Sequence, residues 1–133
     1  MTLSEEEDAY ANRYLLFIYC LDILAQDVIE QCRILQYYNV AWELKNDTLS
    51  DGYDTLSMGE KYLTLYQKCC IKMLLQNIEN IPDEIINVTN IRKNHLKTMS
   101  DPVWTPLRIE ARKLLDILAM ETQRVRRLLN MDP

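Results

Sequence analysis

Glycine and proline are scarce in this sequence, which has only two glycines and four prolines among its 133 residues. Tight turns between short strands depend on these residue types, so their scarcity excludes a β-sandwich or β-barrel with many turns. It also excludes the glycine-rich loops that hold phosphate groups in nucleotide-binding folds. Because 48% of the residues are hydrophobic, the chain can still bury one ordinary core. We therefore expect a single domain over residues 1–133.

Histidine is scarcer still, because His95 is the only one in the chain. A four-helix di-iron site needs two Glu-x-x-His pairs, and none of the four cysteines has the CxxC spacing that favours zinc. The GxSxG, Walker and HExxH motifs are also missing from the sequence. We therefore predict a protein that is not an enzyme, with no catalytic residue, no metal site and no cofactor.

The sequence has no apolar run that suits a membrane. The apolar stretch 14–25 is interrupted by Asp22 and is too short to span a bilayer. It follows the acidic stretch 5–8, whereas a secretory signal begins with basic residues. We expect an intracellular protein, cytoplasmic or nuclear, without a membrane partner.

Helical periodicity is the strongest positive signal. From Tyr10 to Trp42 the apolar residues recur in alternating steps of four and three, which is typical of one helix face. The polar stretch Asn46–Thr55, which contains Gly52, is typical of a loop. Capping residues and prolines then mark three further helix starts. The pattern predicts an all-α antiparallel bundle of four to five helices, spanning about 5–45, 57–80, 83–99 and 106–131.

The first predicted helix is too long for its own domain. A straight helix over 5–45 would extend roughly 60 Å, whereas a compact domain of this size has a diameter of roughly 36 Å. Either the helix breaks near Asn39, or its end projects and a partner covers it. The residues concerned are rich in tyrosine and tryptophan, which are common in interface hot spots. The predicted partner-binding residues are Tyr37, Tyr38, Trp42 and Leu44.

The net charge of −5 is unevenly divided along the chain. Residues 1–54 carry eleven acids and three bases, whereas residues 55–133 carry nine acids and twelve bases. Opposite charge on the two halves would steer antiparallel or head-to-tail association. The overall acidity argues against general affinity for nucleic acid, but two basic clusters leave that alternative open. These candidate nucleic-acid-binding residues are Arg92, Lys93, Arg124, Arg126 and Arg127.

Taken together, these patterns favour a non-enzymatic helical interaction module that is a subunit of a homo- or hetero-oligomer. Its partner would be a second copy or another helical protein. Two alternatives remain open: a nucleic-acid-associated protein that uses the basic residues, and a small helical metal-dependent hydrolase.

Overall fold

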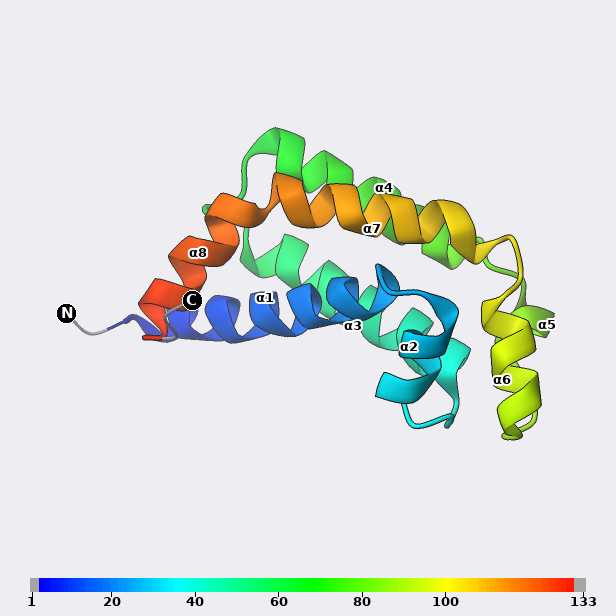
Figure 1. Ribbon diagram of the computed structural model, residues 1–133. Coiled ribbons are helices and arrows are strands. Elements are labelled where there is room, and N and C mark those ends of the chain that lie inside the picture. Colours follow the sequence, from blue (N-terminus) through cyan, green and yellow to red (C-terminus); the bar gives the residue numbers. More distant parts are fainter. Residues whose placement is uncertain (1–2, 131–133) are drawn as a thin grey trace.

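The computed structural model describes residues 3–130, and in this range the chain is all-α, with eight helices and no strand (Figure 1). The four longest helices are α1 (Glu5–Leu24), α3 (Val40–Met58), α4 (Leu65–Glu79) and α7 (Trp104–Ile117). The shorter helices are α2 (Val28–Ile34), α5 (Asp83–Ile86), α6 (Arg92–Met99) and α8 (Ala119–Leu128).

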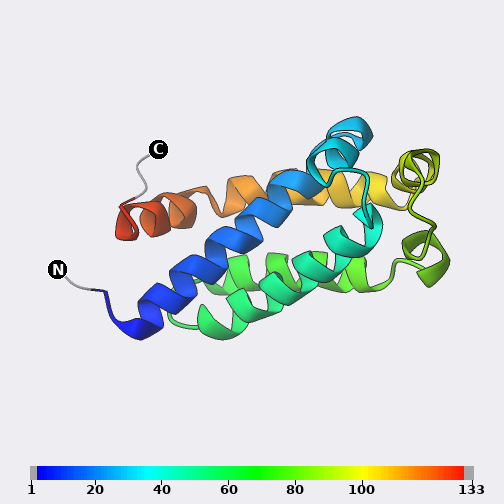
Figure 2. The same ribbon diagram turned by 90° about the horizontal axis from the view of Figure 1, so that it is seen from below.

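The long helices pack around a common core. Helix α1 lies between α3 and α7, while α4 contacts both α3 and α7. Helix α8 packs on α1 at one end of the molecule, and α2, α5 and α6 gather at the other end (Figures 1 and 2). The largest fully buried side chains include Tyr10, Tyr14, Phe17 and Leu21 of α1 and Trp104 of α7. The seam of apolar residues along α1 is therefore a core face.

The chain breaks twice within the predicted helix over 5–45, so a continuous helix is wrong and the expected break near Asn39 is confirmed. Near Asn39 the backbone adopts the left-handed conformation, with φ of 41°, before α3 begins. An earlier break follows Leu24 although no glycine or proline is present. There the Gln31 amide donates to the Leu24 carbonyl at 2.9 Å, and Arg112 Nε donates to the Ala25 carbonyl at 3.0 Å. These side chains satisfy carbonyls that a continuous helix would have paired internally.

The predicted loop Asn46–Thr55 is also wrong, because it lies inside α3. Its small residues Thr48, Gly52 and Thr55 are buried and allow neighbouring helices to approach closely. A Cβ atom on Gly52 would lie 2.6 Å from Leu75 of α4 and 3.0 Å from Phe17 of α1. Gly52 is therefore a packing site and not a turn.

The later predicted helices have different bounds from the observed ones. Helix α4 starts after Thr64 and not near residue 57, because Thr64 and Gln67 form a reciprocal capping box. The predicted helix 83–99 is divided by residues 87–91 into α5 and α6.

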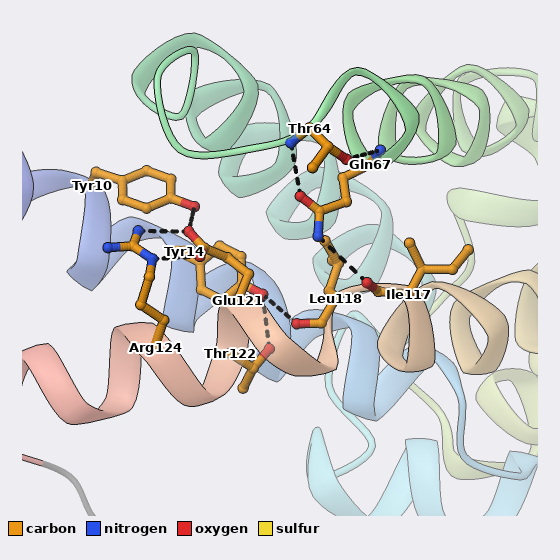
Figure 3. Close-up of polar contacts among 9 residues, drawn as sticks. All are labelled: Tyr10, Tyr14, Thr64, Gln67, Ile117, Leu118, Glu121, Thr122 and Arg124. Atoms are coloured by element: carbon orange, nitrogen blue, oxygen red, sulfur yellow. Dashed lines mark hydrogen bonds and ion pairs between the residues drawn. The ribbon is translucent and has the colours of Figure 1, made fainter.

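The predicted helix 106–131 begins at Trp104 and is interrupted at Leu118, and its expected last residue lies outside the described residues. At the interruption, which Figure 3 shows, the Gln67 side chain donates to the Ile117 carbonyl at 3.5 Å, and the Tyr14 hydroxyl donates to the Leu118 carbonyl at 3.2 Å. Both carbonyls are thus bonded by side chains from other helices at the point where α7 ends.

The connection between α2 and α3 holds backbone strain. Gln36 and Tyr37 have φ of 55° and 54°, in the left-handed region that penalises side chains with a Cβ atom. Gln36 is exposed. We therefore expect Gln36→Gly to raise the free energy of unfolding by about 0.5–1 kcal/mol in urea denaturation. Gln36→Ala serves as the matched control and should not raise the free energy of unfolding. An equal increase in both variants would show that the left-handed backbone at residue 36 is not the cause.

Candidate functional site

Two of the predicted partner-binding residues lie together on the surface at the start of α3. Tyr38 is 59% exposed and Trp42 is 46% exposed. Trp42 also lines a surface cavity of about 390 Å³ together with Asn39 and three residues at the end of α5 and just beyond it, namely Ile86, Asn87 and Val88. We call Tyr38 and these five cavity-lining residues the Trp42 surface. It combines one aromatic side chain in the wall of a hollow with a second exposed aromatic side chain four residues earlier in the chain.

The other two predicted residues occupy different environments. Leu44 is 3% exposed, so it is not part of the Trp42 surface. It lies on the inward face of α3 with Val40, Ala41 and Thr48. Tyr37 is half-buried, and the Arg92 guanidinium covers its ring at 4.4 Å from the ring centre. This cation–π contact links the segment before α3 to helix α6.

One asparagine side chain holds the two parts of the Trp42 surface together. Asn90 Oδ1 accepts the backbone N–H of Asn39 at 2.8 Å and lies 2.9 Å from His95 Nε2. Because this oxygen can only accept, His95 must carry its proton on Nε2. The start of α3, the segment after α5 and helix α6 are thus joined at one atom. These hydrogen bonds fix the backbone that carries Tyr38 and Trp42.

His95 gives this hydrogen-bonded framework a pH dependence. The ring is fully buried, its Nδ1 has no hydrogen-bond partner among the described residues, and burial lowers its pKa below the usual 6.5. The unfolded chain therefore binds a proton more readily than the folded chain, so the stabilising contribution is complete above about pH 6.5 and is lost as the pH falls toward the folded pKa.

We expect the free energy of unfolding in urea to decrease as the pH is lowered below about 6.5, and His95→Gln to flatten this dependence. Glutamine keeps an N–H donor for Asn90 but cannot titrate. Because His95 is the only histidine in the chain, the comparison isolates one group. If the free energy of unfolding of His95→Gln changed with pH as steeply as that of the wild type, His95 would not be the source of the pH dependence.

The structure does not bring the five candidate nucleic-acid-binding residues together. Arg92 and Lys93 lie on α6, whereas Arg124, Arg126 and Arg127 lie on α8 at the opposite end of the molecule (Figures 1 and 2). Arg126 is half-buried beside Asp22 in a small cavity. Lys93 and Arg127 are exposed.

Arg124 is held by internal contacts that fasten α8 to α1 (Figure 3). Its guanidinium donates two hydrogen bonds to Glu121, at 2.6 and 2.8 Å, and lies over the Tyr62 ring. Glu121 is only 6% exposed, and its second oxygen accepts the Tyr10 hydroxyl at 2.6 Å. Burial, together with this carboxylate, raises the pKa of Tyr10 well above its usual range. The cluster is an anchor between helices.

A second apolar groove, which the sequence did not predict, lies between α4 and α7. This groove of about 380 Å³ is lined by Tyr66, Met73 and Leu74 from α4 and by Leu114 and Ile117 from α7. Tyr66 fits the apolar period of α4, which favours a core position, but it is 66% exposed. Periodicity alone could not reveal this, because it does not distinguish the centre of an apolar stripe from its edge.

The described residues give little indication of a metal site, a membrane-spanning helix or a reactive thiol. Within residues 3–130, no group of three or more His, Cys, Asp or Glu side chains could hold a metal ion. No helix in that range has both the length and the apolar character needed to cross a membrane. The four cysteines are free thiols, and burial raises the pKa of Cys20 to about 12. Comparison with protein-family models, curated proteins and solved structures finds no match.

Proposed function

We propose that this protein is a non-enzymatic helical interaction module that binds a protein partner through the Trp42 surface. The long helices α1, α3, α4 and α7 act as an antiparallel bundle that holds this surface rigid. The exposure of Trp42 in the wall of a cavity, with the exposed Tyr38 four residues before it, carries the proposal. Exposed aromatic side chains next to a hollow are the usual anchors of protein interfaces, because each buries a large area at a small cost in side-chain entropy.

The rigidity of the Trp42 surface favours binding of a folded partner. Asn90 fixes the start of α3, and Arg92 covers Tyr37, so little conformational freedom is lost on association. The Trp42 surface also carries no ionised side chain, since its six residues are aromatic, aliphatic or amide residues. Depletion of charge is typical of the centre of an interface.

Affinity capture from native extract, quantified by mass spectrometry, tests the proposal. We expect proteins that are captured by the wild-type chain to be lost from Tyr38→Ala/Trp42→Ala. Tyr53→Ala is the matched control, because Tyr53 is another exposed aromatic residue of α3 that lies outside the surface. Capture that is equal for all three chains would contradict the proposal.

A further inference from the structure

A separate groove lies on the outer side of α1 and α3, away from the Trp42 surface. It encloses about 200 Å³, and its walls include Leu16, Tyr19 and Ile23 from α1 and Glu43, Asp47 and Asp51 from α3. Leu16 and Tyr19 are exposed. A wholly apolar cavity of roughly 150 Å³ accommodates a benzene-sized group, so this groove can take one long aliphatic side chain.

The acidic wall of this groove has unbalanced charge. Asp51 is neutralised by Arg13, whose Nη1 lies 2.9 Å away. Glu43 and Asp47, in contrast, form no ion pair with any residue of the described part of the chain. They are four residues apart on one helix, where like charges repel each other. A cation from another molecule would relieve this repulsion.

The exposed face of α8 has the complementary chemistry. Met120 is 82% exposed, the highest exposure among the large hydrophobic side chains of the described residues. Arg127 lies seven residues further along α8 and therefore on the same face, and it too is exposed. One long aliphatic side chain and one cation are thus presented together, two helical turns apart.

We propose that α8 of one copy of this chain docks in the α1–α3 groove of a second copy, with Met120 in the cavity and Arg127 beside Glu43 and Asp47. Within one chain this contact cannot form, because α8 packs on the other side of α1, where it contacts Tyr10 and Tyr14 (Figure 3) and lies beside Asp22. By helical spacing, that side is opposite the groove residues Leu16, Tyr19 and Ile23. Association is head-to-tail, and the two contact surfaces of each chain differ.

Two variants, each altered at one surface, test this arrangement by sedimentation velocity. The groove variant is Glu43→Lys/Asp47→Lys, and the helix variant is Met120→Gln/Arg127→Gln. Wild-type protein at about 100 µM should associate in about 50 mM salt and dissociate in about 500 mM, since the charge attraction is then screened. Each variant alone should associate at least about tenfold more weakly. The matched control, Gln76→Lys/Asn80→Lys at exposed positions in the last turn of α4 and just after it, should behave as wild type.

An equal mixture of the two variants gives the decisive result. Each variant keeps one intact surface, so the mixture should form a 1:1 complex that cannot extend further. A wild-type protein that stays monomeric, or a mixture that stays monomeric, would overturn the proposal. Circular dichroism checks that both variants fold, and Glu43→Gln/Asp47→Asn provides a milder groove variant that removes the repulsion but must still lose association. The Trp42 surface is intact in every variant, so failure here leaves the proposed function untouched.

Discussion

Replacing Trp42 with alanine should weaken partner binding by about 30-fold or more, while the free energy of unfolding changes by less than about 1 kcal/mol. The two effects separate because Trp42 is half exposed and contributes little to the core, yet it forms one wall of the surface cavity. A buried aromatic anchor at an interface contributes about 2 kcal/mol or more, and each 1.4 kcal/mol is a factor of ten in affinity.

Titration calorimetry with the partner identified by capture would measure this loss, and urea denaturation would measure the stability. Tyr53→Ala should leave the affinity unchanged, because Tyr53 lies further along α3 and bonds to Glu79 of α4. A Trp42→Ala variant that binds normally would remove the residue from the interface. A variant that loses both binding and stability would show that Trp42 acts through the fold.

Glu121→Ala should lower the free energy of unfolding by about 3 kcal/mol, the largest loss of stability that we expect from a single polar residue here. Its carboxylate is buried and receives hydrogen bonds from both Tyr10 and Arg124. Removing it leaves the Tyr10 hydroxyl buried without a partner. The cost is below that of a fully buried pair because the Arg124 side chain is 40% exposed and can recover water.

Urea denaturation with Glu121→Gln as the control separates charge from hydrogen bonding. Glutamine keeps one acceptor for Tyr10 but loses the ionic contact with Arg124, so we expect roughly half of the alanine effect. Equal losses in both variants would assign the whole effect to charge. A loss below about 1 kcal/mol for alanine would contradict the role of this cluster as the anchor of α8.

Helix type and core face could be read from the sequence, whereas helix ends could not. Tyr10, Tyr14, Phe17 and Leu21 are buried as their spacing predicts, because the 3.6-residue period is a local property. The ends depend on contacts from distant residues. No local signal marks the break at Leu118, where the Ile117 and Leu118 carbonyls accept hydrogen bonds from side chains on other helices.

The break before α2 does have a local sequence signal, although a weak one. Asp27 caps α2 by accepting the Glu30 N–H at 2.9 Å, and an acidic residue followed three positions later by glutamate is a helix-start pattern. However, the apolar spacing continues unbroken through these residues, and that spacing favours one long helix over a new helix start. Gly52 illustrates the opposite error, because a glycine among polar residues resembles a turn, whereas here close helix packing requires it.

The candidate site was only partly accessible to sequence reasoning. Aromatic enrichment drew attention to Tyr38 and Trp42, but the same run contains Leu44, which faces the core. The cavity beside Trp42 is completed by Ile86, Asn87 and Val88, which lie more than forty residues away along the chain. Asn90 joins the two segments through a single oxygen, and a contact of this kind depends on tertiary structure alone.

The most direct test of the central claim is site-specific photo-crosslinking in the cells that produce this protein. Benzoylphenylalanine would replace Tyr38 in one chain and Tyr53 in another, both of which are exposed tyrosines. We expect a discrete crosslink to a protein partner from position 38, none from position 53, and loss of the first when Trp42→Ala is added. No crosslink at position 38, or the same products from both positions, would contradict the claim that the Trp42 surface binds a partner.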